Sequence, residues 1–152
     1  MARLLLLAHA PLASALKAVA IHTFPELAAR VDAIDVVADC PPDQLERCIR
    51  EHLEASRACN EPEMLILTDV FGATPANVAQ RLADGVLVRV LAGVNVPMLW
   101  RALNYAALPL DELVTRSMAG ATQGVMPVAS TRPQNQTFQP NVHDSDSHHH
   151  QQ

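Results

Sequence analysis

Two aliphatic runs, each ending in a chemically active side chain at a turn, constrain most strongly what this chain can fold into. Residues 65–77 read as an apolar strand that runs into Asp69, then a turn with Gly72, then Thr-Pro at the start of a helix. Residues 4–11 repeat the plan, with four leucines that lead to His9 and a proline. Such runs are typical of strands buried on both faces of a parallel sheet.

The rest of the chain continues this alternation of strands and helices. Apolar residues recur at helical spacing after each predicted strand, and prolines stand where first helical turns tolerate them. Asp32 and Asp35 within the second strand favour an edge position. A proline also confines a short last strand to an edge. We expect strands over residues 3–8, 31–38, 63–68, 86–91 and 124–128, and helices beginning near residues 11, 41, 74, 97 and 111.

This alternation predicts an α/β fold with right-handed crossovers and a mainly parallel sheet. The simplest doubly wound arrangement of four strands has the order 2-1-3-4, with helices on both faces. Ligand sites in such sheets form at the carboxyl ends of the strands that flank the chain reversal, here the first and third. Those ends carry His9 and Asp69, so we expect the two side chains to form one site.

The 152 residues suit one domain, which we place at residues 1–129. Aromatic residues make up only 3%, so the core must be aliphatic. Residues 130–152 are polar and histidine-containing, and we expect a disordered tail. The histidines at 148–150 are compatible with weak metal chelation, but an unstructured polar tail is the simpler interpretation, and we assign it no function.

Charge and cysteine content exclude several classes of function. A formal net charge of −5 argues against a nucleic-acid groove. Three cysteines without CxxC spacing imply neither a disulfide framework nor a zinc knuckle. No apolar run approaches the ~18 residues of a membrane span. We therefore expect a cytoplasmic protein that neither enters the membrane nor binds nucleic acid, with no cofactor or metal.

A histidine beside a helix start, with a carboxylate in reach, can act as a general base, a metal ligand or a nucleophile for a phosphoryl group. As a nucleophile, His9 would need Asp69 to accept a hydrogen bond from one ring nitrogen and leave the other free. The turn from Phe71 to Thr74 would offer N–H groups and a hydroxyl to phosphoryl oxygens, and Gly72 would allow close approach. A metal site would require further ligands, and none is obvious.

Three motifs together resemble the mannose-type enzyme IIA domains of the bacterial phosphoenolpyruvate-dependent sugar phosphotransferase system. Residues 8–10 (Ala-His-Ala) resemble that family's Ser-His-Gly turn. Residues 68–77 (Thr-Asp-Val-Phe-Gly-Ala-Thr-Pro-Ala-Asn) resemble its Thr-Asp-Leu-Phe-Gly-Gly-Ser-Pro-x-Asn motif. Residues 93–99 (Gly-Val-Asn-Val-Pro-Met-Leu) resemble its Gly-Val-Asn-Leu-Pro-Met-Leu segment. The likeness covers about residues 1–128.

The resemblance implies a histidine phosphocarrier. His9 would accept phosphoryl from phosphorylated HPr and pass it to a IIB component, with Asp69 as its partner. The family's four-stranded domains form homodimers that exchange a C-terminal strand, which would here be residues 124–128. Two positions depart from the family pattern, because alanine replaces a glycine at each, and both still offer an N–H. The phosphate-binding residues implied are Ala10, Gly72, Ala73 and Thr74.

Two other functions remain open from the sequence. Phosphorylation of His9 would serve as a signal to partner proteins, rather than as a step of sugar uptake, if the chain is a regulatory module. A flavodoxin-like domain could bind a flavin or another small molecule at the same switch point, although aromatic residues to stack on the ligand are scarce.

Overall fold

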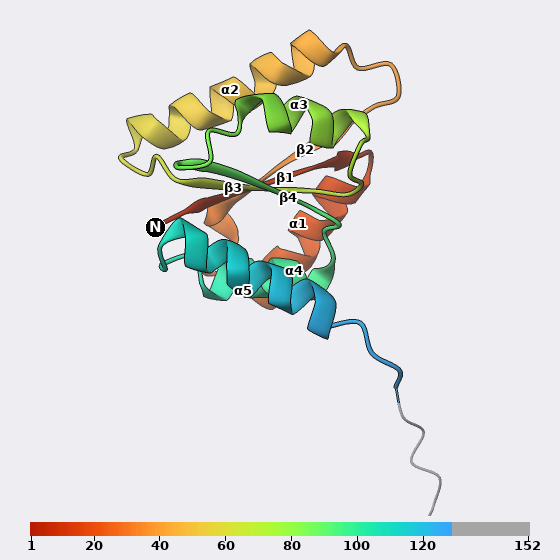
Figure 1. The fold of residues 1–152 in the computed structure, drawn as a ribbon, viewed down its shortest axis with the longest axis vertical. Coiled ribbons are helices and arrows are strands. Elements are labelled where there is room, and N and C mark those ends of the chain that lie inside the picture. The colour runs from red at the N-terminus through yellow and green to blue at the C-terminus, as the bar shows by residue number, and fades with distance from the viewer. Residues whose placement is uncertain (129–152) are drawn as a thin grey trace, which may run out of the picture.

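The computed structural model describes residues 1–128, which form a four-stranded parallel sheet (Figure 1). The strand order is β2-β1-β3-β4, so the predicted doubly wound order is confirmed. As predicted, β2 with its two aspartates lies at an edge. The strands are β1 (Arg3–His9), β2 (Val31–Val36), β3 (Met64–Thr68) and β4 (Val88–Ala92).

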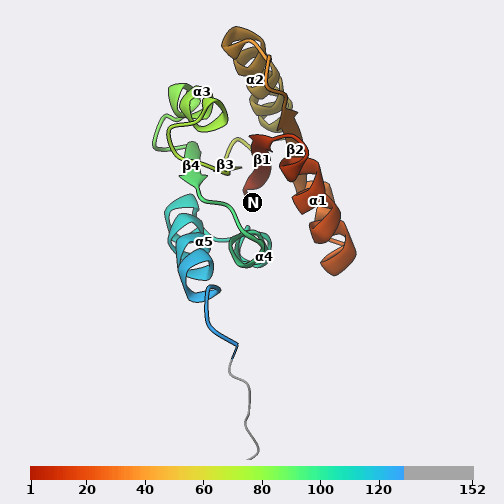
Figure 2. The same ribbon diagram turned by 90° about the vertical axis from the view of Figure 1, so that its right-hand side faces the viewer.

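Helices cover the sheet in two layers, which Figures 1 and 2 show from two directions. One layer holds α1 (Leu12–Thr23), α4 (Val96–Asn104) and α5 (Leu110–Gln123). The other holds α2 (Pro42–Ala58) and α3 (Thr74–Leu82). A short 3-10 helix, η1 (Ala28–Arg30), leads into β2.

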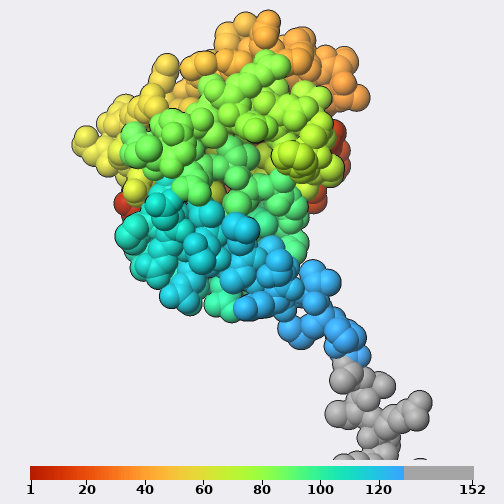
Figure 3. All heavy atoms as spheres, viewed as in Figure 1, coloured from red at the N-terminus to blue at the C-terminus, as the bar shows by residue number. Residues whose placement is uncertain are grey.

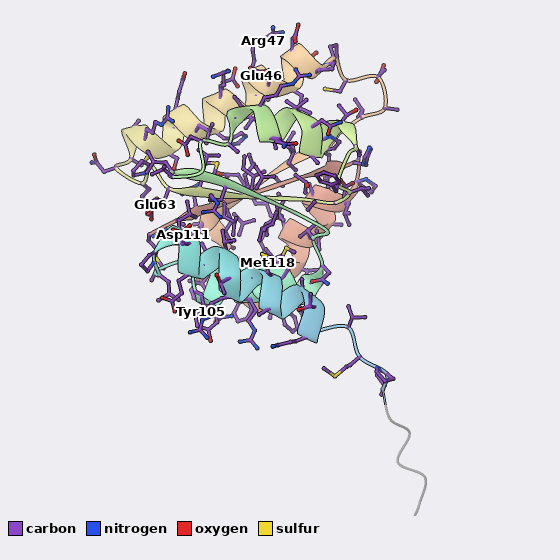
Figure 4. All side chains as sticks on the ribbon, in the orientation of Figure 1. Glu46, Arg47, Glu63, Tyr105, Asp111 and Met118 are labelled. Carbon is purple, nitrogen blue, oxygen red and sulfur yellow. The ribbon has the colours of Figure 1, made fainter. Side chains whose placement is uncertain are left out.

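The core is aliphatic on both sides of the sheet. Successive side chains of β1 point to opposite faces, so Leu4 and Leu6 pack with α1, α4 and α5, whereas Leu5 and Leu7 pack with α2 and α3. All four leucines are fully buried. Figure 4 shows side chains filling the space above and below the strands. Burial on both faces explains why these strands lack the polar alternation of a half-exposed strand.

Asp84 explains why β4 begins two residues later than the sequence predicts. Its Oδ1 accepts hydrogen bonds from the N–H groups of Val86, Leu87 and Val88 at 2.9, 2.7 and 2.9 Å. A carboxylate that binds successive N–H groups folds the backbone into a turn. Val86 is therefore not part of the strand, although its side chain type suits one.

The predicted strand at residues 124–128 does not form within the single chain. Gly124 instead ends α5, donating its N–H to the carbonyl of Gly120 at 3.0 Å. The next residues have no regular structure, and the side chains of Val125 and Val128 are 77% and 95% exposed. Figure 3 shows this segment leaving the body beyond α5. A strand needs a hydrogen-bonded neighbour, and the described part of the chain offers this segment none.

Helix α5 is tied to the sheet by charge as well as by packing. Asp111, labelled at the start of α5 in Figure 4, pairs with Arg89 of β4. None of the helices in residues 1–128 combines the length and the apolar character needed to cross a bilayer. The predicted tail at residues 130–152 lies outside the described residues.

Candidate functional site

The site lies at the carboxyl edge of the sheet, on the right in Figure 1, where α1 and α3 both begin. Strand β1 ends at His9, and Asp69 follows the last residue of β3. Because β1 and β3 are neighbours, the two strand ends meet although they are 60 residues apart in sequence. The expectation that this topology brings His9 and Asp69 together is met.

Asp69 holds His9 through two contacts to one carboxylate oxygen. The ring Nδ1 of His9 lies 2.6 Å from Oδ2 of Asp69, and the backbone N–H of His9 donates to the same oxygen at 2.9 Å. The other oxygen, Oδ1, accepts the N–H of Val70 at 2.8 Å. A bond from Nδ1–H fixes the imidazole tautomer, so the lone pair of Nε2 remains available.

The same contacts keep Asp69 ionised. Burial acts to raise the pKa of this carboxyl, since its side chain is only 10% exposed. The hydrogen bonds from the backbone and imidazole of His9 and from the N–H of Val70 outweigh burial and hold the pKa below its usual range. His9, in contrast, has a side chain that is 51% exposed. The pair thus combines a fixed carboxylate with an accessible ring.

The turn before α3 presents unused donors beside this pair. Gly72 has φ +84°, a left-handed conformation that glycine adopts without strain. Asn77, on the first turns of α3, donates its Nδ2–H to the carbonyl of Gly72 at 2.9 Å and so holds the turn. Among residues 1–128, no turn or loop hydrogen bond is donated by the backbone N–H groups of Phe71, Gly72 or Thr74.

Ala73 fits its place in the turn but does not offer a free donor. Its φ is −83°, in the extended region open to any residue, so the family's glycine is not needed for conformation. Its N–H bonds the carbonyl of Val70 at 3.3 Å, as in a tight turn. Ala73 therefore adds no free N–H to the turn, unlike Gly72 and Thr74, whose N–H groups donate no turn or loop hydrogen bond among residues 1–128.

Ala10 departs further from expectation. Its N–H donates to the carbonyl of Val36 at 3.0 Å, because the pairing of β1 with β2 extends to His9, which lies opposite Val36 and one residue beyond the predicted end of the strand. The following peptide bond to Pro11 is cis. Asn60 is the only non-glycine residue with a positive φ in residues 1–128, so alanine is unstrained here too. The N–H of Ala10 is therefore engaged in the sheet, and its contact with a phosphoryl oxygen stays a prediction.

The start of α1, near His9, also has an N–H group that is already engaged. Asp35 reaches over from β2, and its Oδ1 accepts the N–H of Ser14 at 3.1 Å. The Ser14 hydroxyl, followed by the N–H groups of Ser14 and Ala13, holds the pKa of Asp35 below its usual range. Sequence reasoning treated Asp35 only as the mark of an edge strand. The sequence offered one signal that Asp35 lies near the site, because it stands one residue before the end of β2.

The third motif, residues 93–99, lies beside the end of β3 and binds its backbone. The N–H of Gly93 donates to the carbonyl of Asp69 at 2.9 Å, and the N–H of Val94 donates to that of Thr68 at 2.9 Å. Asn95 then caps α4 by accepting the N–H of Met98 at 2.9 Å. The motif therefore fixes the backbone of Asp69 rather than adding a reactive group.

The fold and the site together define a doubly wound α/β domain with a histidine–aspartate pair at its topological switch point. The model of the family described as "PTS system fructose IIA component" matches residues 3–118, which is most of the chain. The protein belongs to this family of IIA components of the phosphotransferase system. The resemblance drawn from the three motifs is thereby confirmed.

Solved structures agree with this assignment. The mannose/sorbose-specific IIA subunit from Enterococcus faecalis is 26% identical, with a TM-score of 0.74 over 86% of this chain and 96% of that one. The phosphotransferase component EIIA from Streptococcus agalactiae has the same TM-score at 21% identity, over 84% of this chain and 97% of that one. At this lower identity the likeness concerns the fold alone.

The fold also occurs in a protein with a different description. A sigma-54 interaction domain protein from Enterococcus faecalis is 12% identical, with a TM-score of 0.68 over 81% of this chain and 92% of that one. A comparison with curated proteins gives no significant match.

Proposed function

We propose that the protein is a histidine phosphocarrier that accepts a phosphoryl group on His9 from phosphorylated HPr and passes it to a IIB component. The observation that carries the proposal is the geometry of the pair. Nδ1 of His9 is held by an ionised carboxylate that is largely buried, while the ring itself is half exposed. A nucleophile needs this combination of fixed orientation and free approach.

The transfer balances without a cofactor. The lone pair of His9 Nε2 attacks the phosphorus of the donor, and the bond between that phosphorus and the donor's leaving atom breaks. The electron pair of the broken bond returns to the donor. Positive charge that develops on the imidazole is stabilised by Asp69, whose oxygen lies 2.6 Å from Nδ1. The reverse attack, by an acceptor on the IIB component, releases the phosphoryl group and restores the neutral ring.

The turn before α3 supplies the phosphoryl site. The unused N–H groups of Gly72 and Thr74, and the positive end of the α3 dipole, suit an anion beside His9. Val70 and Phe71 flank the site with side chains that are 57% and 81% exposed. Exposed apolar side chains at the rim are suited to brief docking of a partner protein.

A homodimer is part of the proposal. β4 is an edge strand with no neighbour among the described residues on its outer side, and a hollow of about 540 Å³ is lined by the last residue of β4, the turn after it and α5. Residues 124–128 of a second copy would complete the sheet there and bury their exposed side chains. Light scattering that gave the mass of a single chain at micromolar concentration would rule this arrangement out.

Phosphorylation from phosphoenolpyruvate tests the function directly. Incubation with enzyme I, HPr and labelled phosphoenolpyruvate should give a base-stable, acid-labile phosphate on His9. The His9→Ala variant should carry no label, whereas His22→Ala, which removes an exposed histidine of α1, should be labelled like the wild type. Omission of HPr should abolish labelling, and addition of a IIB protein should discharge it.

Absence of label from the wild type, or label at another residue, would disprove the proposal. Discharge to a protein other than a IIB component would favour the regulatory alternative.

A further inference from the structure

We propose that Asp35 is a positioning residue, whose carboxylate occupies the N-terminus of α1 and confines a phosphoryl group on His9 to the N-terminus of α3. The inference rests on the proposed function, because it concerns the phosphorylated state of His9. Two helices begin beside His9, and each would attract an anion through its free N–H groups and its dipole. The two helix starts differ in the structure, because a carboxylate already binds an N–H group of α1, and none in residues 1–128 does so at α3.

The register of the sheet aims Asp35 at α1. Ala8 of β1 lies beside Asp35 of β2, and Ala8 faces the layer that contains α1. Side chains of neighbouring residues in register share a face, so the carboxylate of Asp35 lies on the α1 side. There its Oδ1 accepts the N–H of Ser14, the third residue of α1, at 3.1 Å.

This contact replaces a cap that α1 lacks in its own sequence. The residue before α1 is Pro11, which has no side chain able to cap, and no side-chain cap bond is formed there. The Ser14 hydroxyl lies 3.1 Å from the carbonyl of Pro11 and also faces the Asp35 carboxylate. A lowered carboxyl pKa keeps Asp35 charged at neutral pH, so the α1 terminus already holds an anion.

The start of α3 is arranged in the opposite way. Its cap residue is Ala73, which forms no side-chain cap bond, and no acidic residue stands in the first turn. Donors at this terminus remain unused, as described for Gly72 and Thr74. A phosphoryl group therefore meets an open helix terminus on one side and a carboxylate on the other.

Asp35 has a second consequence for the carrier. Its negative charge repels the two negative charges of a phosphohistidine, so it raises the free energy of the phosphorylated protein relative to the free protein. The effect makes onward transfer to the acceptor easier. A carrier gains from such a balance, because it has to release what it binds.

The test compares Asp35→Asn with Asp32→Asn. The first variant keeps an oxygen that can accept the N–H of Ser14 but removes the charge. The second removes one charge from the same strand at its other end, where Asp32 pairs with Arg3. The measured quantity is the equilibrium phosphorylated fraction of each protein in mixtures of HPr and phosphorylated HPr.

Asp35→Asn should raise the equilibrium constant for phosphorylation about two- to fivefold at low salt, as expected for charges near a protein surface. The increase should shrink at about 1 M salt, because exposed charges are then screened. Asp35→Glu, which restores the charge, should stay near the wild type, and so should Asp32→Asn. A merely structural role would change the melting temperature without this dependence on salt.

The outcomes separate the two proposals. If the wild type takes up phosphoryl on His9 but Asp35→Asn matches Asp32→Asn at low salt, the role of Asp35 is wrong and the proposed function stands. If the wild type takes up no phosphoryl group, both the proposed function and the role of Asp35 are wrong. Circular dichroism of each variant confirms that it is folded, and Asp35→Glu provides the comparison if Asp35→Asn is not.

Discussion

The helices α1 and α3 begin at the same edge of the sheet, yet they offer opposite environments to His9. At α1 the N–H of Ser14 is bound by Asp35, and the N–H of Ala10 just before the helix is bound by the sheet. At α3 the N–H groups of Gly72 and Thr74 donate no turn or loop hydrogen bond within the described part of the chain. The difference teaches that a helix start is an anion site only when no nearby acceptor has already taken its N–H groups.

The largest effect is expected from damage to the open terminus. Gly72→Ala places a side chain at φ +84°, a conformation that costs an L-residue about 1–2 kcal/mol. The turn should shift to relieve that strain and move the N–H groups of Gly72 and Thr74 off the phosphoryl oxygens. We expect about tenfold slower phosphorylation of His9 by phosphorylated HPr, measured by rapid quenching.

Gly85→Ala is the matched control for this change. Gly85 also has a positive φ, +76°, and in neither glycine would the added Cβ meet another atom within 4 Å. Both variants should therefore lose similar thermal stability, but only Gly72→Ala should lose transfer rate. Equal rates for the two variants would mean that the turn does not hold the phosphoryl group.

A pair of hydroxyl deletions sharpens the contrast between the two helix starts. Thr74→Ala removes a hydroxyl from the open terminus, and we expect phosphorylated His9 to hydrolyse about five times faster, since one hydrogen bond contributes about 1 kcal/mol. Ser14→Ala removes the hydroxyl that faces Asp35 at the closed terminus, and the half-life should be unchanged. A shorter half-life for Ser14→Ala alone would reverse the assignment of open and closed ends.

The last prediction concerns acid and the stability of the fold rather than the rate of transfer. The folded pKa of Asp69 is lowered, so its stabilising contribution is fully present above the ordinary aspartate pKa and is lost as pH falls through the folded value. At pH 7, Asp69→Asn should reduce the free energy of unfolding by about 1–2 kcal/mol. Urea titrations should show the difference shrinking as the pH falls below the ordinary aspartate pKa of about 3.9. A difference that stayed constant during that fall would contradict the ionised pair.

Most of the fold could be predicted from the sequence because burial on both faces leaves a clear signal. The four strands, their order and the edge position of β2 follow from aliphatic runs and from the rule that crossovers are right-handed. The segment at 124–128 has a strand-like composition but no strand neighbour among residues 1–128. Composition indicates that a segment is able to form a strand, whereas the strand itself forms only beside another strand that accepts and donates its hydrogen bonds.

The centre of the site could be predicted for a similar reason. Neighbouring strand ends must meet, which placed His9 beside Asp69. The use of individual N–H groups could not be predicted, because it depends on the length of each strand and on side chains that arrive from elsewhere. The carbonyl of Val36 accepts the N–H of Ala10 only because β1 pairs with β2 one residue further than predicted. Asp35 binds the N–H of Ser14, which lies 21 residues away in sequence.

The side-chain amide of Asn95 gives the molecule one more property. Besides capping α4, its Nδ2–H donates to the carbonyl of Ala121 in the last turn of α5 at 3.1 Å. Two residues earlier, the N–H of Gly93 is bound to the carbonyl of Asp69. The end of α5 is thus linked through residues 93–95 to the backbone of Asp69. Residues 124–128 therefore start from a position that these two hydrogen bonds fix relative to Asp69, and so relative to His9.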